Sequence, residues 1–218
     1  MDRRILGVLF ILSFFAWIGS AVWFFGHSRG GAETPSYLPV ERHGKFEVRD
    51  YPALELIQTP LASAVGEKAM NESFRRLVSY LRRGNASSEK IPMTAPVLVN
   101  PGPAIEPNTS PFPYPAPASI SIILPQVVVQ AGAPAPQAEG VTLVPQPEGR
   151  FAVLRYSGSR DAVSEARAAD RIGNWLQVHH WEAEASPIFA YYDPPWIPPV
   201  FRRNEVWVRV HSAAAPTP

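Results

Sequence analysis

One order of predicted elements, strand, helix, strand, strand, occurs twice along the chain and constrains the fold more than any other feature. The first copy runs from Phe46 to Pro125 and the second from Phe151 to Val210. Polar and apolar residues alternate in the strands, whereas apolar residues recur every three or four positions in the helices. The two copies share little sequence. They predict an α+β fold with helices on one side of an antiparallel sheet.

The first predicted helix spans about 66–83 and the second about 161–179. Apolar spacing assigns the first helix a buried stripe of Met70, Phe74, Leu77, Val78 and Leu81. The same spacing assigns the second helix a stripe of Ala162, Ala166, Ala169, Ile172 and Leu176. We interpret the four arginines of the first helix as a solvated face: Arg75, Arg76, Arg82 and Arg83.

An uncharged run from Ile5 to Phe25 precedes the repeat. As a helix it is long enough to cross a hydrocarbon core of about 30 Å. Arg3 and Arg4 precede the run and favour a cytoplasmic N-terminus. We therefore predict a single-pass inner-membrane protein with a periplasmic domain. The alternative is a cleaved signal peptide and secretion, although signal cores are usually shorter, about 7–15 residues.

These interpretations divide the chain into five parts. The predicted parts are a cytoplasmic end (1–4), a transmembrane anchor (5–25), a linker (26–40), one folded domain (41–211) and a disordered tail (212–218).

Composition and motifs exclude several functions. Lys and Arg number 20 against 19 Asp and Glu, so no large positive charge favours nucleic acid. The chain has no cysteine, which rules out disulfides, thiolate catalysis and cysteine-ligated zinc. It also lacks a nucleophile elbow, a phosphate loop, a zinc-protease motif and a dinucleotide fingerprint. We therefore predict a protein that is not an enzyme.

The stretch KIPMTAPV, from Lys90 to Val97, carries no obvious chemistry. Its two prolines exclude a helix and favour an edge strand with an irregular start. We expect Thr94 to bond the backbone and the apolar residues to pack beneath a helix. Contact of Met93 with a ligand is the alternative.

KIPMTAPV resembles the Ile-x-Met-Thr-x-Pro-Val signature of the SOUL haem-binding family. Four further segments resemble family blocks in the family's order: FEVRDYP, SFRRLVSYLRRGN, FAVLRYSG and YYDPPWIPPVFRRNEVWV. Together they cover Lys45 to Val210. The motif positions to which we assign structural roles are Ile91, Met93, Thr94, Pro96, Val97, Arg202, Arg203, Asn204 and Glu205.

The resemblance implies a pseudo-twofold domain with about eight antiparallel strands, in a sheet or distorted barrel, and two helices. It also implies non-covalent binding of haem or another tetrapyrrole, here by a membrane-anchored bacterial member. We expect the ligand in an apolar cleft beside the first helix, with basic side chains near its propionates. The predicted ligand-binding residues are Asn71, Phe74, Arg75, Val78, Arg82, Tyr192 and Trp196. Some relatives carry basic residues where Asn71 and Ser79 stand here.

Several alternatives stay open. Arg202 to Glu205 can form a salt-bridge and turn network, with Arg203 on Glu205 or Asp50, or one arginine can hold a propionate. The aromatic loop from Tyr191 to Trp196 can wall a flat ligand or plug one end of the sheet. No histidine falls in a family motif, so we assign no axial or metal ligand. The function can instead be binding of another apolar molecule, lipid or protein, or hydrolysis of a small molecule.

Overall fold

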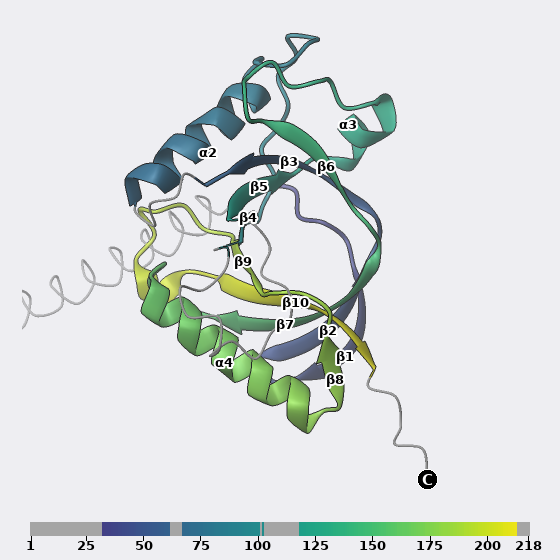
Figure 1. Cartoon of the computed structure of the whole chain (residues 1–218), viewed down its shortest axis with the longest axis vertical. Coiled ribbons are helices and arrows are strands. Elements are labelled where there is room, and N and C mark those ends of the chain that lie inside the picture. The colour runs from purple at the N-terminus through teal and green to yellow at the C-terminus, as the bar shows by residue number, and fades with distance from the viewer. Residues whose placement is uncertain (1–31, 62–66, 101, 103–117, 213–218) are drawn as a thin grey trace, which may run out of the picture. The chain divides into compact units, whose positions relative to one another are not determined.

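The computed structural model describes residues 32–61, 67–100, 102 and 118–212. These residues form an α+β domain with ten strands and three α-helices (Figure 1). All strand pairs are antiparallel, and the sheet is open, with β1 and β6 at the two ends of its strand order. The predicted α+β class is therefore correct. The strand number was underestimated, and the closed barrel that the resemblance allowed is not formed.

The elements have the following bounds. The strands are β1 (Leu38–His43), β2 (Phe46–Tyr51), β3 (Leu54–Pro60), β4 (Val97–Asn100), β5 (Ser119–Ile123), β6 (Thr142–Gln146), β7 (Gly149–Tyr156), β8 (Trp181–Ala183), β9 (Ile188–Tyr191) and β10 (Asn204–Ser212). The helices are α2 (Glu67–Leu81), α3 (Gln126–Ala131) and α4 (Ala162–Val178), with a 3-10 turn at Pro199–Phe201.

The strand order of the sheet shows the twofold repeat directly. The order is β1-β2-β7-β10-β9-β4-β5-β3-β6, with β8 paired to the far end of β10. When β1 is left out, the order reads the same from its two ends: β2 corresponds to β6, β7 to β3, β10 to β5, and β9 to β4. The pseudo-twofold axis therefore passes between β9 and β4. Each half gives one strand to the other, because β2 pairs with β7 and β6 pairs with β3.

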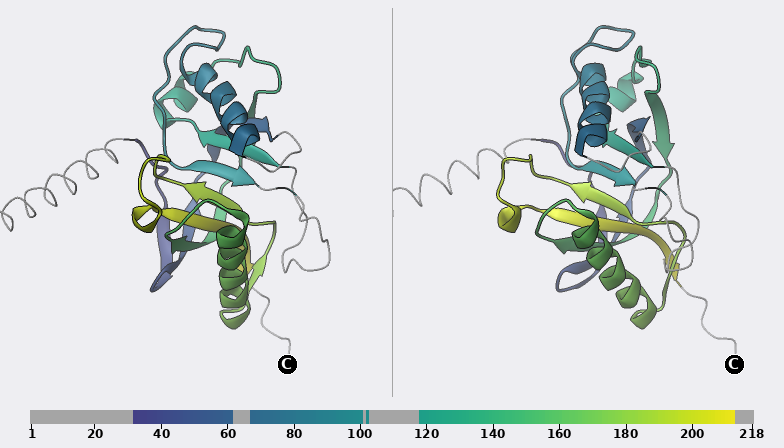
Figure 2. Two further views of the ribbon diagram at one scale, coloured as in Figure 1. Left: turned by 90° about the vertical axis from the view of Figure 1, so that its left-hand side faces the viewer. Right: turned by 60° about the vertical axis from the view of Figure 1, so that its left-hand side comes forward.

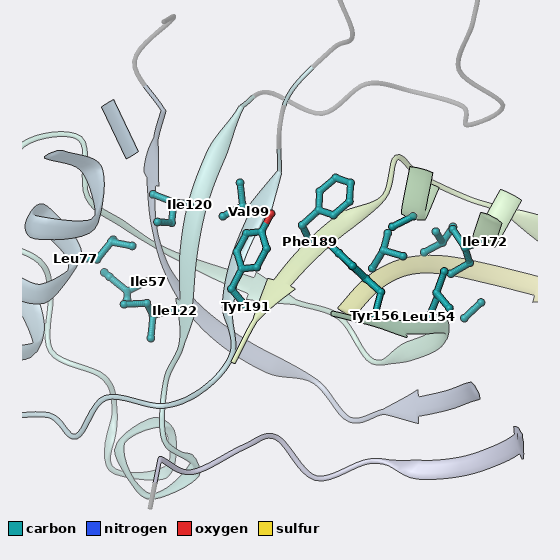
Figure 3. Close-up of a cluster of buried hydrophobic side chains, with 14 of the residues drawn as sticks. Ile57, Leu77, Val99, Ile120, Ile122, Leu154, Tyr156, Ile172, Phe189 and Tyr191 are labelled. Carbon is teal, nitrogen blue, oxygen red and sulfur yellow. The ribbon is translucent and has the colours of Figure 1, made fainter. Parts of the chain in front are cut away.

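The sheet has two buried faces because side chains alternate along each strand. Both α2 and α4 cover one face, where Leu77 and Ile172 pack toward the strands (Figure 3). Phe189 and Tyr191 of β9 lie between these two groups in the same view. The opposite face holds a smaller cluster that includes Trp207 of β10. Figure 2 shows α2 and α4 from two further directions.

The two main helices lie close to their predicted spans, but α4 is rotated from the prediction. Ala162 and Ala166 are exposed and Ala169 is half-buried. The buried residues of α4 are Ala168, Ile172, Gly173, Trp175 and Leu176. Alanine gives little hydrophobic contrast between the sides of a helix, so the large Trp175, which stacks on Phe46 at 5.3 Å, decides the orientation instead.

The predicted inner-membrane location requires correction. Of the helices in the described ranges, none is long and apolar enough to cross a bilayer. The longest, α4, has 17 residues, which corresponds to about 26 Å. The predicted anchor at 5–25 lies outside the described residues, as do 1–4 and 213–218. A single-pass inner-membrane protein with a periplasmic domain is therefore not supported.

Two further elements lie where no regular structure was expected. β1 begins at Leu38, inside the predicted linker, and pairs with β2 through a tight turn at Gly44. The short helix α3 begins directly after Pro125, where no helix was predicted. A six-residue helix is too short to show a clear apolar stripe.

Candidate ligand-binding site

Helix α2 presents the predicted ligand-binding residues, and three buried side chains hold it on the sheet. Leu77 packs in the core with no exposed area. The Ser73 hydroxyl donates to the carbonyl of Pro60 at the end of β3, at 3.2 Å. The Tyr80 hydroxyl donates to the carbonyl of Pro134, after α3, at 2.9 Å. These contacts at both sides of the helix fix its rotation about its own axis.

Four predicted residues on α2 (Asn71, Phe74, Arg75 and Val78) lie on one flank of the helix, and Arg82 follows directly after its last residue. Phe74 and Val78 are half-buried, and Phe74 packs against the edge of the core. Asn71, Arg75 and Arg82 are exposed. This flank therefore combines apolar side chains near the sheet with polar and basic ones toward solvent.

A cavity of about 570 Å³ lies on the other flank of α2. Its described lining residues are Arg76, Ala138, Glu139 and Gly140. Arg76 is about 200° around the helix from both Phe74 and Val78. None of the seven predicted ligand-binding residues belongs to this described lining. The cavity thus adds one residue from α2 and three from the α3–β6 connection to the candidate site.

The prediction missed these residues for a physical reason. Arg76 is one of four arginines that helical spacing alone places on a solvated face. The 138–140 segment comes close to α2 only because β6 pairs with β3, beneath the helix. A glycine two residues before a strand was the one available signal, and Gly140 adopts a φ of +74°.

Tyr192 and Trp196 do not join the residues on α2. Tyr192 belongs to the cluster on the opposite face of the sheet, where its hydroxyl donates to Glu205 Oε2 at 2.9 Å. Trp196 lies in the loop between β9 and β10 and is 67% exposed. The structure therefore divides the seven predicted residues among α2, the second sheet face and a surface loop.

The motif residues of the last strand form a buried ionic network on the second face. Glu205 is fully buried and accepts hydrogen bonds from Arg49 Nη1 at 2.9 Å and Arg203 Nη2 at 2.7 Å. Trp207 Nε1 donates to the same carboxylate at 2.8 Å. Asp50, the other partner considered for Arg203, pairs with Arg150 instead. Arg49, Arg203, Tyr192 and Trp207 all donate to this carboxylate, and Arg49 also pairs with Glu47. The buried charges of this network therefore have partners of opposite sign.

The pKa of Glu205 follows from these contacts. Burial alone raises it, but hydrogen bonds from Arg49, together with the charges of Arg49 and Arg203, lower it below the ordinary value. Burial likewise raises the pKa of the Tyr192 hydroxyl well above the ordinary range, and the Glu205 charge adds to this effect. Glu205 is therefore ionised, and Tyr192 is neutral and donates.

The KIPMTAPV segment joins α2 to the sheet. The backbone N–H of Ile91 donates to the carbonyl of Leu81 at 2.8 Å, and the Ile91 side chain is buried. The Thr94 hydroxyl donates to the carbonyl of Ile123 on β5. The Ala95–Pro96 peptide bond is cis, and Met93 is 43% exposed. The segment thus links the end of α2 to strand β5 through hydrogen bonds to the backbone carbonyls of Leu81 and Ile123. Leu98, the residue after Val97, belongs to the cluster on the second face of the sheet.

A second polar cluster lies where α4 meets β7 and β9. The Tyr191 hydroxyl donates to the carboxylate of Glu165 on α4. Burial raises the pKa of Glu165 above the ordinary value, although the hydrogen bond from Tyr191 opposes this. The guanidinium of Arg160 lies 4.7 Å above the Tyr191 ring. This cluster is separate from the cavity beside α2.

The described part of the chain holds no cluster of three or more His, Asp or Glu side chains that could bind a metal ion. His43 and His179 lie near Trp175, with ring centroids 6.0 and 4.3 Å away from the indole. Their arrangement is that of an aromatic stack at the end of α4.

Comparison with known proteins gives a consistent result. A family model described as SOUL heme-binding protein matches residues 32–209. The chain is 28% identical to "Heme-binding protein 1" of Xenopus laevis, over 74% of this chain and 82% of that protein. It is 27% identical to "Heme-binding protein 2" of Homo sapiens, over 81% of this chain and 85% of that protein.

Solved structures share the fold at low sequence identity. The EcmrR C-terminal domain matches with a TM-score of 0.51 and 10% identity, over 81% of this chain and 99% of that chain. A hydrolase from Listeria innocua matches with a TM-score of 0.50 and 11% identity, over 79% and 94% of the two chains. At these identities the likeness concerns the fold alone.

Proposed function

We propose that this chain, which belongs to the SOUL heme-binding family, binds haem or a related tetrapyrrole without a covalent bond. The observation that carries the proposal is the extent of the family match, residues 32–209, which includes every described strand and helix apart from the last residues of β10. Both curated relatives are named as haem-binding and are covered over more than four fifths of their length.

Helix α2 carries the candidate ligand surface, and its two flanks differ. The Arg76 flank borders a cavity of about 570 Å³. On the other flank of α2, Phe74 and Val78 offer apolar surface, with Asn71, Arg75 and Arg82 at its rim. We propose that the macrocycle lies against α2 and that these side chains contact it.

The two other predicted residues have different supporting contacts. The exposed indole of Trp196 can stack on a flat ring, as large aromatic surfaces do. The hydroxyl of Tyr192 is bonded to Glu205, and the Arg203 guanidinium lies 3.7 Å from the centre of its ring, so the other ring face is the part that remains for a ligand. We assign no axial ligand to the iron. In this proposal the protein holds the ring by burial and by polar contacts at its edge.

Titration of the full chain with haemin tests the proposal. We expect a saturable shift of the Soret band and quenching of tryptophan fluorescence at micromolar haemin. Phe74→Ala should weaken binding about tenfold or more, because it removes a large apolar contact. Val127→Ala, an exposed apolar residue on α3, is the matched control. Absence of any saturable spectral change would refute the proposed function.

A further inference from the structure

We propose that the connection between β9 and β10, residues 192–203, binds the surface of an anionic lipid bilayer. Its exposed apolar side chains contact the lipid, and two guanidinium groups beside them bind the headgroup phosphates. The contact is peripheral and involves no helix that crosses the bilayer. The inference does not rest on the proposed function, and haemin takes no part in its test.

The connection gathers exposed apolar side chains that are scattered elsewhere. Trp196 is 67% exposed, Val200 72% and Phe201 59%. In the described part of the chain, no other three large exposed apolar residues lie within six positions of one another. Figure 2 shows the 3-10 turn that carries Val200 and Phe201, in yellow, at the margin of the domain in both views. Exposed apolar groups that lie together mark a binding surface.

The backbone beneath these side chains is held in one conformation. Ile197, in the middle of the connection, is fully buried, and its N–H donates to the carbonyl of Pro194 at 3.2 Å. The N–H of Gly158 donates to the carbonyl of Pro199 at 3.0 Å, which joins the turn to the loop before α4. Four of the residues 194–199 are prolines, in which φ is fixed. Binding therefore orders little additional backbone, which lowers its entropic cost.

Two guanidinium groups of the same region donate to backbone carbonyls and form no ion pair with a carboxylate of the described residues. Arg202 donates to the carbonyl of Ile197 through Nε at 2.7 Å and to that of Pro195 through Nη2 at 2.5 Å. Arg160 donates through Nη2 to the carbonyl of Asp193, and its buried Nε has no hydrogen-bond partner in the described structure. Each guanidinium has five N–H donors, so both keep donors for an anion.

The charges around the connection favour an anion. Burial lowers the pKa of Arg160, and the nearby charge of Arg202 lowers it further, whereas Asp193 opposes this effect. Arg203, the third arginine, pairs with Glu205 at 2.7 Å. Two like charges thus remain in one half-buried place, and Asp193 can balance one of them. A headgroup phosphate would supply the second negative charge.

The shape and chemistry of the connection favour a lipid surface over a groove on a protein. Its apolar side chains lie on a turn at the margin of the domain (Figure 2). A bilayer accepts such side chains without a complementary cavity. Tryptophan concentrates at the boundary between headgroups and acyl chains, and arginine is attracted to anionic leaflets. The occupant is therefore a bilayer with anionic headgroups.

A single fluorescent label tests the contact, because the chain has no cysteine of its own. Val200→Cys in the full chain carries the environment-sensitive NBD group. Val178→Cys, at the end of α4, is the matched control, since Val178 is 73% exposed. With vesicles that contain about 30% phosphatidylglycerol in phosphatidylcholine, we expect a blue shift and about a twofold rise in emission for the label at position 200 alone. Vesicles of phosphatidylcholine alone should give a much smaller response.

Two substitutions in the labelled chain separate the apolar from the charged contribution. Trp196→Ser should weaken the affinity for anionic vesicles about tenfold, because it removes a large exposed apolar side chain. Arg202→Gln should weaken it about fivefold, the share of one basic residue near an anionic surface. Arg202 also holds the loop carbonyls, so salt gives a second test of charge in the labelled chain without a further substitution. NaCl at about 0.5 M should remove most of the response.

Several results would overturn the lipid surface. It fails if the label at position 200 does not respond to anionic vesicles, or if the label at position 178 responds equally. It fails likewise if neutral and anionic vesicles act alike, or if salt has no effect. The same response to about 10 mM sodium phosphate without vesicles would show a site for a soluble anion and would refute the bilayer as the occupant.

Discussion

Arg49 and Glu205 stand 156 positions apart in the chain and form a buried ion pair, with 2.9 Å between Nη1 and Oε2. Their side chains are 4% and 0% exposed. Arg49 comes from β2, in the first half of the repeat, and Glu205 from β10, in the second. The pair therefore spans the two halves across β7, which lies between these strands in the sheet.

Replacement of Glu205 by glutamine should destabilise the fold strongly. The change leaves Arg49 and Arg203 without their shared carboxylate, and loss of one partner of a buried pair costs about 3–5 kcal/mol. Because Arg49 keeps a second partner in Glu47, at 2.6 Å, we expect a loss of about 3 kcal/mol. Urea unfolding followed by tryptophan fluorescence measures it.

A surface pair gives the control for this prediction. Glu184 pairs with Arg209 at 3.0 Å, with both side chains partly exposed. Glu184→Gln should change the free energy of unfolding by less than about 1 kcal/mol, as exposed ion pairs contribute little. Equal losses for the two variants would contradict a special role for the buried network.

The contribution of Glu205 should disappear in acid. Its pKa is lowered in the folded state, so its stabilising contribution is complete above the ordinary value of 4.5 and is lost as the pH falls through the lowered folded-state value. We expect the stability difference between the wild type and Glu205→Gln to be constant from pH 7 to about 5 and to shrink below that. A difference that persists at pH 2 would argue against an ionised Glu205.

Glu165 should show the opposite dependence. Its pKa is raised in the folded state, chiefly by burial, so the folded protein binds this proton more tightly than the unfolded chain does. The wild type should therefore lose stability relative to Glu165→Gln as the pH rises from about 4 through the raised value. Paired unfolding curves at pH 4 and pH 7.5 test this, and a difference of the same size at both pH values would contradict it.

Replacement of either of two buried threonines by valine should change the stability of the ligand-free chain, but in opposite directions. Thr94→Val removes the donor to the Ile123 carbonyl and should cost about 1–3 kcal/mol. Thr59→Val removes a buried hydroxyl that has no hydrogen-bond partner among the described residues, so it should stabilise the ligand-free chain by about 1 kcal/mol. Urea unfolding of both variants provides the comparison. Destabilisation by Thr59→Val would show that its hydroxyl is bonded in solution.

Local pattern predicted the elements well and the placement of side chains poorly. The spans of α2 and α4 follow from the spacing of apolar residues. The rotation of α4 did not follow, because its alanines are nearly equivalent to one another and Trp175 decides the packing.

The candidate site was harder to predict because distant segments build it. Gly140 comes to line the same cavity as Arg76 only because β6 pairs with β3, and the local sequence pattern does not predict that pairing. In the sequence, nothing distinguishes Arg76 from the other three arginines of the first predicted helix, which are also exposed. The family signature, by contrast, can be recognised in the sequence. Its residues Thr94 and Glu205 make specific hydrogen bonds, to the Ile123 carbonyl and with Arg49, that few other residue types could make.

The exchange of β2 and β6 between the halves has a consequence for how the chain can be divided. A fragment that stops before β6 would carry a β3 with one bare edge, and the remaining fragment would carry a β7 with the same defect. Each piece would therefore present an unpaired strand that only its counterpart fits. Cutting the chain between α3 and β6 should therefore yield two aggregation-prone fragments that regain native structure when they are mixed, by fragment complementation.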